Sequence, residues 1–313
     1  TQNIGSLKNK GFEFDVKVDI IKNTQKDLTW DFDFNVARNI TTLEKLNSEA
    51  KYFGGGAYDY FKIKVGGKTG ILYGYKYGGR LIRTNEELVA LKTVNPETGQ
   101  QQYYRDNNNY ERPGDLYIMD LDGDGQITAD GDRTEIGNAN PDFFGGFGTT
   151  LYWKGLMVNA TFTYSVGADR FYDEEKSSAG DINAYNVSKN VLKSWTMNPG
   201  VDRGYPRAMY YGWGSNSIIT DRYVHDVSFL RLSALNISYR LPKRLFGSSI
   251  VDAIDLTFQA TNLFTWTKYP GMDPQGNFST SYSAFYNVLY GNDKLYKEKN
   301  LPQAVKTPEG AEK

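Results

Sequence analysis

Long stretches of the chain alternate between apolar and polar residues, and this pattern restricts the possible fold more than any other feature. In residues 12–20, aromatic and aliphatic residues occupy the even positions and charged residues occupy the odd ones. Five further segments alternate in the same way: 30–36, 143–153, 156–165, 235–240 and 254–266. A period of two turns one face of a β-strand toward an apolar phase and the other toward water. The sequence therefore predicts an all-β fold of antiparallel strands.

The length of these segments separates two all-β architectures. A tilted transmembrane strand needs about 9–11 residues to cross a bilayer, and each segment spans about ten. The strands of a soluble sandwich have about 5–6 residues. Length therefore favours a transmembrane β-barrel, with a soluble β-domain as the alternative.

The connections between the segments differ strongly in length. Short connections are predicted at residues 23–27, at Lys154-Gly155 and in the segment that begins at Pro242. The other two, residues 39–142 and 167–225, are far longer than the usual structureless loops of a compact soluble domain. Bacterial outer-membrane barrels have short periplasmic turns and long extracellular loops, so the first strand is predicted to run toward the periplasm.

The first long connection is predicted to contain structure of its own. Ile71, Tyr73, Tyr75 and Tyr77 stand at alternate positions and predict one arm of an internal hairpin.

The two ends of the chain lack features of a complete barrel. The residues that follow Thr1 do not resemble a signal peptide, and six strands cannot close a wide barrel, so we expect part of a longer barrel. The tail from Asn292 to Lys313 is polar, rich in lysine and without the alternating aromatic end of a barrel strand, so a closing strand is not evident there. We expect residues 1–275 to supply barrel strands and extracellular loops, and residues 276–313 to form a divergent polar tail.

Composition narrows the protein class further. No segment approaches the roughly 18 consecutive apolar residues of a transmembrane helix. The net charge of −1 gives no indication of a nucleic-acid partner. The chain has no cysteine, and therefore no disulfide framework. A mean hydropathy of −0.57 is compatible with a barrel that carries long polar loops.

Several short motifs occur in an order that is typical of one family. They are NKGFE (9–13), GILYGYKYGG (70–79), GDLYIMDLDGDGQIT (114–128), IG (136–137), NP (140–141), SFLRL (228–232), SYRLP (238–242), NLFT (262–265) and YPGMDP (269–274). In this order, over residues 5–275, the chain resembles the SusC-like TonB-dependent outer-membrane transporters. The resemblance implies the C-terminal portion of a barrel of about 22 strands with a plugged lumen.

The same resemblance implies partners and a cargo. A SusD-like surface lipoprotein would cover the barrel, and the TonB complex would deliver energy through a segment upstream of Thr1. The cargo would be an oligosaccharide or a peptide, taken up across the cell outer membrane.

Residues 120–128 (DLDGDGQIT) match the first nine positions of a calcium-binding loop. Carboxylates at its first, third and fifth positions converge on one cation, and the glycine that follows makes a sharp turn. Gly131 stands where such a loop usually has a bidentate glutamate, so flanking aspartates would complete the shell. The predicted ligands of a structural Ca²⁺ are Asp120, Asp122, Asp124, Gln126 (through its carbonyl), Asp130 and Asp132. The alternative is an aspartate- and glycine-rich turn whose side chains cap their own backbone.

Other candidate sites have simpler structural explanations. His225, the only histidine, is predicted to be a solvated residue at a strand entry. Residues 173–175 (DEE) are predicted to be a solvated charge run, because glycosidase carboxylates are paired by spatial separation and not by adjacency. Residues 145–148 (GGFG) precede a strand and not a helix, which indicates a strand entry or bulge and not a nucleotide site. No nucleophile–base pair stands out, so no enzyme is predicted.

Aromatic residues fall into two groups. Those in the long loops either contact a sugar or a partner protein, or pack over the barrel mouth. They are Tyr103, Tyr104, Tyr110, Tyr205, Tyr210, Tyr211 and Trp213. Those at the strand ends predict the girdles of a membrane interface. They are Trp153, Tyr164, Tyr239 and Trp266.

Transport through a barrel is the leading functional hypothesis. A soluble, calcium-stabilised β-domain that binds glycans or mediates adhesion would explain the aspartate-rich loop and the loop aromatics. It would not explain why short turns and long loops lie on opposite sides, and an enzyme is the weakest of the three hypotheses.

Overall fold

A computed structural model describes residues 5–46, 52–54, 61–91, 93–94, 101–102, 112–173, 175–176, 188–196, 204–208, 218–247 and 250–275. The chain divides into two compact units, Thr1–Pro274 and Gln275–Lys313. The predicted polar tail, residues 276–313, lies outside the described residues, so the absence of a strand there stays a prediction. Within the described ranges, no helix combines the length and apolar character needed to cross a membrane.

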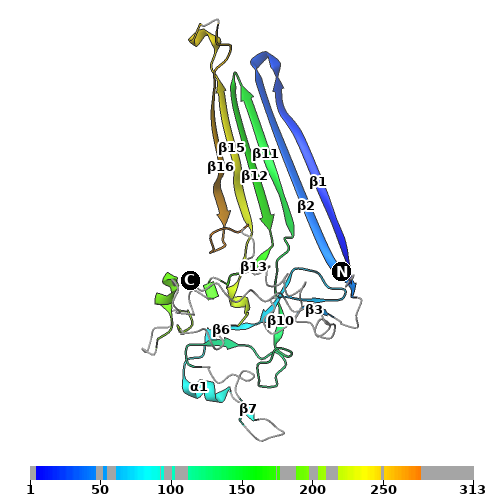
Figure 1. The fold of residues 1–313 in the computed structure, drawn as a ribbon, viewed down its shortest axis with the longest axis vertical. Helices are drawn as coiled ribbons and strands as arrows, with labels where there is room; N and C mark the ends of the chain where they lie inside the picture. The colour runs from blue at the N-terminus through cyan, green and yellow to red at the C-terminus, as the bar shows by residue number, and fades with distance from the viewer. Residues whose placement is uncertain are drawn as a thin grey trace, which may run out of the picture. The chain divides into compact units, whose positions relative to one another are not determined.

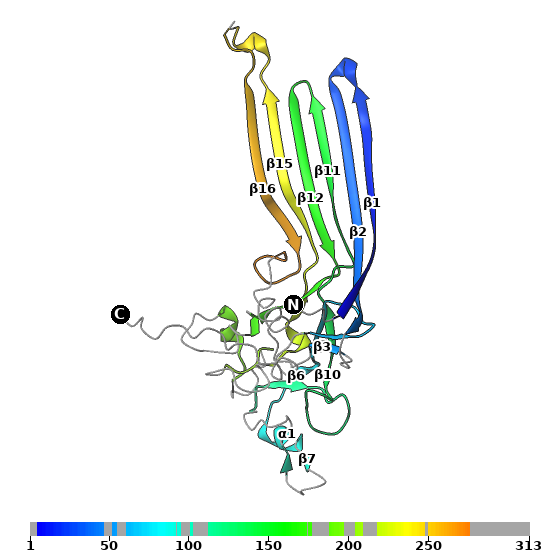
Figure 2. The same cartoon turned by 45° about the vertical axis from the view of Figure 1, so that its right-hand side comes forward.

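Six long antiparallel strands form one sheet (Figures 1 and 2). They are β1 (Gly5–Asn23), β2 (Leu28–Leu46), β11 (Phe143–Trp153), β12 (Leu156–Val166), β15 (Phe229–Arg240) and β16 (Asp255–Thr267). Their order in the sheet, β1-β2-β11-β12-β15-β16, is their order in the chain. All six predicted strands are confirmed. However, β1 and β2 have 19 residues each and exceed the prediction, because their pairing continues to Gly5 and Leu46.

The register of the sheet collects the alternating apolar residues on one side, here called the apolar face. One row across the six strands consists of Val16, Phe34, Phe147, Phe162, Leu232 and Phe264. The next row consists of Val18, Phe32, Thr149, Ala160, Leu235 and Ala260. Phe14, Phe258 and Trp266 are each more than half exposed. So large an uncovered apolar surface requires an apolar phase against it.

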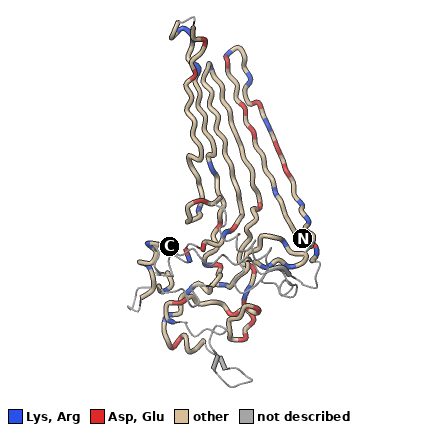
Figure 3. The backbone as a smooth tube through the Cα atoms, in the orientation of Figure 1, with Lys and Arg blue, Asp and Glu red and all other residues tan. Residues whose placement is uncertain are grey.

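The opposite side of the sheet, here called the polar face, carries hydrogen-bonding and charged side chains. One of its rows consists of Lys17, Asp33, Gly148, Thr161, Ala234 and Thr261. Charged residues are concentrated on β1 and β2 (Figure 3). Toward β15, hydroxyls and amides pair across strands, as between Thr163 and Ser233 at 2.7 Å. An apolar outside and a polar inside are the two faces of a transmembrane barrel wall, so the predicted fold class is confirmed.

Aromatic residues mark both limits of the apolar face. Trp153 and Tyr239 lie in one row near the short turns. Tyr164 and Trp266 lie in another row near the long loops. Along β12 these rows are separated by about 27 Å at 3.4 Å per residue. A barrel tilt of about 40° converts this to about 20 Å of depth, close to the ~25 Å apolar band of outer-membrane barrels. The rows therefore fit the predicted girdles.

Glycines in β11 bring its neighbours close together, and of the two predicted alternatives, a strand entry or a bulge, the bulge does not form. The register of β11 is continuous on both sides. A Cβ on Gly145 would lie 2.2 Å from the backbone oxygen of Asn35 and 2.9 Å from the Tyr164 hydroxyl. Tyr164 crosses this glycine, donates a hydrogen bond to the same oxygen (2.9 Å) and stacks on Phe34. The missing side chain thus makes room for an aromatic contact across two strands.

Bulges occur instead in β1 and near the middle of β15 and β16. The alternation predicted to run to Ile20 is interrupted there, because the register shifts between Asp19 and Ile21 and Ile21 is the partner of Trp30. On β16 the irregularity includes Asn262, whose φ of 52° is a left-handed conformation that asparagine tolerates better than most residues.

The short connections lie at one end of the sheet and the long ones at the other (Figure 1). The 3-10 helix η1 (Thr24–Lys26) joins β1 to β2. Lys154 and Gly155, with φ of 48° and 89°, form the two-residue turn between β11 and β12. The third connection, from Leu241 to Ile254, contains η5 (Lys243–Leu245) and is longer than the other two.

Short elements in the long connections build a second core. They are β3 (Tyr52–Gly54), β4 (Lys62–Lys64), β5 (Ile71–Tyr75), β6 (Tyr77–Leu81), α1 (Asn85–Ala90), β7 (Thr93–Val94), β8 (Gln101–Gln102), β9 (Leu116–Ile118), β10 (Arg133–Asn138), β13 (Asp169–Phe171), η2 (Lys189–Lys193), η4 (Asp221–Tyr223) and β14 (Val224–Asp226). β5 pairs with β10, and β6 pairs with β9. The strand predicted at residues 71–77 is present as β5 and the start of β6, but it is not one arm of a hairpin, because β5 and β6 each pair with a segment far away in the sequence. Their buried side chains, such as Leu81, Ile82 and Leu116, form a hydrophobic cluster.

A charge on the apolar face tests the membrane contact. We expect Leu235→Arg, in the middle row, to lower the free energy of unfolding of the complete protein in phospholipid vesicles by about 2–4 kcal/mol. The matched control is Asn236→Arg on the polar face, which should have little effect because arginine there meets water. Equal losses for the two variants in denaturant titrations would contradict the assignment of the faces.

Candidate functional site

The long loops are anchored where β12 and β15 end. β13 and β14 pair directly beyond these strands, with Asp169 opposite Asp226. Between the two pairs, the backbone N–H of Val227 donates to the Ala168 oxygen at 2.8 Å. The Gly167 N–H donates to the Ser228 hydroxyl at 2.9 Å. The loop core therefore continues the hydrogen-bonding of the sheet without a flexible linker.

Two arginines hold the segment after β16 against this junction, and we call Arg170, Arg231 and Asp273 the arginine clamp. Arg231 is buried on the polar face and contacts the Asp273 carboxylate at 2.6 Å and the Thr265 hydroxyl at 2.9 Å. Arg170 donates to the backbone oxygens of Asp273 (3.0 Å) and Pro274 (2.9 Å). The clamp gives the YPGMDP motif a structural role that the sequence did not indicate.

A cavity of about 440 Å³ opens beside the clamp. Its lining residues are Tyr172, Glu175, Ser188, Asn190, Tyr205, His225, Lys268 and Pro270. They come from the segments after β13 and β16, from β14, from η2 and its N-cap, and from residues 204–208, so the fold of the loops brings them together. Ligand pockets commonly measure about 300–1,000 Å³. Phenol rings beside amide, hydroxyl and carboxylate groups can accommodate one sugar ring or one peptide residue.

An acid–histidine pair forms one wall of this cavity. His225 Nε2 lies 2.7 Å from a Glu175 carboxylate oxygen, and both side chains are largely buried. Tyr205 donates its hydroxyl to the same carboxylate at 3.4 Å. Burial, and next the nearby Glu175 charge, raise the pKa of Tyr205, so its phenol stays neutral at physiological pH. The His225 ring also meets the edge or face of Tyr172 and Tyr269.

Two predictions about these residues are wrong. His225 is not simply solvated, and Glu175 does not belong to a solvated charge run, because the segment after β13 folds back onto β14. Asp173 does conform to the prediction, since it is partly exposed and pairs with Lys176 at 3.0 Å. Glu174, the third acid of this run, lies outside the described residues.

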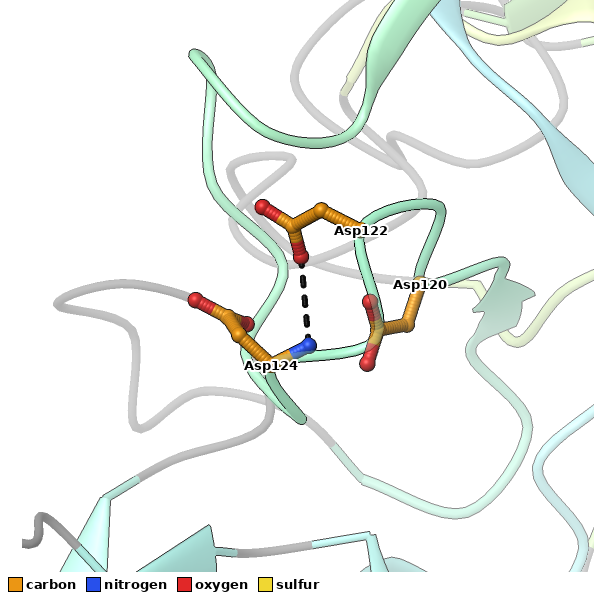
Figure 4. Close-up of side chains that lie close together, drawn as sticks. All are labelled: Asp120, Asp122 and Asp124. Atoms are coloured by element: carbon orange, nitrogen blue, oxygen red, sulfur yellow. Dashed lines mark hydrogen bonds between the residues drawn. The ribbon is translucent and has the colours of Figure 1, made fainter.

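The aspartate-rich loop lies between β9 and β10. The carboxylates of Asp120, Asp122 and Asp124 lie within 4.8 Å of one another (Figure 4). Gly123 and Gly125 have φ of 78° and 83°, which let the backbone turn sharply around the Asp120 carboxylate. Asp120 accepts hydrogen bonds from the N–H groups of both glycines, at 2.6 Å and 2.7 Å.

The other predicted ligands lie differently. Asp132 is buried under the loop and accepts from the N–H groups of Leu121 (2.6 Å) and Thr128 (2.7 Å). Burial raises the pKa of Asp132, although these two hydrogen bonds oppose the shift. Asp130 is exposed and is not a member of the carboxylate group found among the described residues. Gln126 donates its N–H to Asp124 at 2.7 Å, as the capped-turn alternative also expects.

Gly131 explains why this loop has no glutamate at its twelfth position. A Cβ at Gly131 would lie 2.0 Å from an Asp122 carboxylate oxygen. A side chain there would displace Asp122, so a cation in this loop would bind fewer protein carboxylates than in a loop with that glutamate.

The predicted loop aromatics are described only in part. Tyr205 lines the cavity. The others lie outside the described residues: Tyr103, Tyr104, Tyr110, Tyr210, Tyr211 and Trp213.

Removing the charge of the clamp tests its role. We expect Asp273→Asn to destabilise the segment after β16 by about 1–3 kcal/mol, because a buried arginine loses its charged partner. Hydrogen exchange of residues 268–275 should then accelerate. Asp252→Asn, at a fully exposed carboxylate, should leave exchange unchanged. Unchanged exchange in Asp273→Asn would show that the clamp does not hold the segment.

Curated proteins related to the chain are TonB-dependent receptors. The TonB-dependent receptor P3 of Formosa agariphila is 31% identical over 300 residues, which are 93% of this chain and 27% of that protein. SusC of Bacteroides thetaiotaomicron is 26% identical over 281 residues, which are 88% of this chain and 25% of SusC. The chain thus spans about a quarter of the length of the curated relatives it matches. No family model matches it.

Solved structures agree with the sequence comparison. A structure of the RagAB peptide importer, in its "closed-closed" state, superposes with a TM-score of 0.61 at 25% identity. The match covers 88% of this chain and 28% of that chain. Over nearly its whole length, this chain is therefore related to the SusC-type TonB-dependent receptors and corresponds to one segment of them.

Proposed function

We propose that the chain forms part of the wall and the extracellular loops of a TonB-dependent nutrient importer in the cell outer membrane. The observation that carries this proposal is the two-faced sheet. Its apolar face fits lipid, its polar face fits a water-filled or plugged lumen, and two aromatic rows limit the apolar band. The relatives of the chain support the same function.

We propose that a SusD-like lipoprotein covers the loop side of this wall and that the TonB complex supplies energy. Similarity to SusC supports both partners. The loop core, which is built on the ends of β12, β15 and β16, offers the lipoprotein an ordered surface.

We propose that the cargo is an oligosaccharide or a peptide and that the cavity beside the clamp contacts it. Asn190, Ser188 and the Glu175–His225 pair line the cavity and can hydrogen-bond either cargo. Transport requires no covalent step, so Glu175 and His225 are assigned to shaping the cavity and not to catalysis.

A soluble calcium-stabilised module fits the structure less well. Such a module would have to leave the apolar face, including Phe258 and Trp266, uncovered in water. Exposed apolar patches of this extent are rare on soluble monomers.

Uptake measurements test the transport proposal. Cells that lack the gene should lose TonB-dependent uptake of one oligosaccharide or peptide class from a labelled nutrient panel, and the complete gene should restore it.

Asn190→Ala should then raise the half-saturating cargo concentration about 2- to 12-fold, because one hydrogen bond is lost. Lys189→Ala, at an exposed neighbour outside the cavity lining, is the matched control. Uptake that does not depend on the gene would refute the proposal.

We also propose that the aspartate-rich loop binds a structural calcium ion. The converging carboxylates of Asp120, Asp122 and Asp124 repel one another without a cation, and hard oxygen ligands suit calcium. Ile127, within the same loop, is buried in the loop core. A cation that fixes the loop would therefore also stabilise the packing of that core.

Limited proteolysis tests this proposal. Calcium should slow cleavage near residues 120–132 in the complete protein, and Asp120→Asn with Asp124→Asn should remove the protection.

Because folding raises the pKa of Asp132, its contribution to stability is present at low pH and is lost as pH rises through that pKa. The protection by calcium should therefore be larger at neutral pH than in acid. Glu135→Gln, an exposed acid outside the loop, should keep full protection, and calcium-independent cleavage of the unsubstituted protein would exclude the site.

A further inference from the structure

The three connections at the short-turn end of the sheet differ in chemistry. The first, around η1, and the second, Lys154-Gly155, are tight and polar. The third, from Leu241 to Ile254, projects beyond the other two (Figures 1 and 2). It contains five large apolar residues after its proline: Leu245, Phe246, Ile250, Val251 and Ile254. A long apolar turn at this end needs a physical reason, since two residues suffice to join β11 to β12.

This third connection, here called the apolar turn, has a defined structure in its described part. The Leu241 N–H donates to the Ile254 oxygen at 2.9 Å and closes its base. Within it, Pro242 accepts from the Leu245 N–H at 2.9 Å, and Lys243 accepts from the Gly247 N–H at 3.1 Å. The exposure of Leu245 is therefore set by a folded backbone.

The apolar turn presents hydrophobic side chains to its surroundings. Leu245 is 65% exposed and Ile250 is 91% exposed. The tips of the other two turns, residues 24–27 and 154–155, are polar. Apolar side chains are stabilised when they are removed from water, so water is an unfavourable environment for this surface.

Basic side chains accompany the apolar ones. Lys243 and Arg244 both lie on η5 and are exposed. Lys243 has only a 3.8 Å contact with the exposed Asp252, and exposed pairs of this kind contribute little. Within the described ranges Arg244 makes no ion pair, so the η5 surface is locally positive.

The apolar turn is continuous with the apolar face of the wall. Leu256, the second residue of β16, lies opposite Tyr239 in the aromatic row at this end. Both are exposed on the face assigned to lipid. The Arg240–Asp255 pair, with two contacts of 2.8 Å and 3.0 Å, marks the level at which the wall passes into the turn.

We propose that the apolar turn inserts Leu245 and Ile250 into the periplasmic leaflet of the outer membrane, with Lys243 and Arg244 against anionic phospholipid headgroups. Apolar side chains beside lysine and arginine are the usual composition of segments that lie in a membrane interface. The turn thereby anchors the β15–β16 edge of the wall at a fixed depth. This inference rests on the proposed membrane placement of the apolar face.

Site-directed fluorescence measures the depth of each segment. Single cysteines at Leu245, Gln25 and Phe258 in a cysteine-free version of the complete protein would carry an environment-sensitive dye. Gln25 is the matched control in a polar turn at the same membrane surface, and Phe258 reports on the apolar face. The protein would be reconstituted in vesicles of phosphatidylethanolamine and phosphatidylglycerol, with nitroxide on the upper acyl chain of some lipids.

We expect the nitroxide lipids to quench the dye at Leu245 and at Phe258 at least about two-fold more strongly than at Gln25. Replacing phosphatidylglycerol with phosphatidylcholine, or introducing Lys243→Gln with Arg244→Gln, should reduce quenching at Leu245 only. Each basic side chain near an anionic surface favours docking about five-fold, so the double substitution should have a clear effect.

Other outcomes would overturn specific claims. Quenching at Phe258 without quenching at Leu245 would refute the apolar turn alone and leave the transport proposal intact. An unquenched Phe258 would refute the membrane placement itself. The dye at Leu245 could instead report an apolar environment that nitroxide lipids do not quench and that becomes more apolar as protein density rises. This result would assign the turn to contacts between protein copies. Insensitivity to phosphatidylglycerol and to the double substitution would refute the role of Lys243 and Arg244.

Discussion

Backbone hydrogen bonding in a medium without water is the constraint on which the rest of the structure depends. Inside a bilayer every N–H and C=O must find a partner in the protein, and a β-sheet supplies those partners only to strands that have neighbours. β2, β11, β12 and β15 are paired on both sides, whereas β1 and β16 each have one neighbour among the described residues. Those two edges need further strands to complete a barrel, and the curated relatives, about four times as long as the matched region, have the length to provide them.

The same pairing concentrates the candidate site chemistry at the loop end of the wall. Successive side chains of a strand face lipid and lumen in turn. Irregular backbone and buried charged groups therefore occur mainly near and beyond the strand ends. There Arg231, near the start of β15 on the polar face, binds Asp273, and β13 and β14 extend the ladder toward the cavity. Because Arg231 belongs to the sheet and Asp273 to the returning segment, one contact between a buried arginine and a half-exposed carboxylate couples the position of the cavity wall to the wall of the barrel.

Local periodicity was enough to predict the strands but not their partners in the loops. The alternation of residues 156–165 determines both faces of β12, because a one-residue slip would exchange lipid and lumen contacts. The strand at residues 71–75 was also predictable, yet its pairing with β10 depends on packing between segments that are far apart in sequence. The convergence of Asp120, Asp122 and Asp124 is local and was predictable from their spacing. The burial of Asp132 depends on how the loop packs, and spacing alone does not predict it. His225 and Glu175 are separated by 50 positions, and no periodic signal connects them.

The aspartate-rich loop shows how a surface site can depend on a core. Asp132 is buried beneath the loop and accepts hydrogen bonds from two backbone N–H groups. Burial disfavours its ionised form and raises its pKa. Ile127 anchors the same loop in the hydrophobic cluster that β6 and β9 share. A bound cation would reduce the repulsion that Asp120 and Asp122 exert on Asp132, and would thereby stabilise the ionised form of this buried cap. Calcium would then act on the loop core through Asp132, even though this residue stands apart from the converging carboxylates.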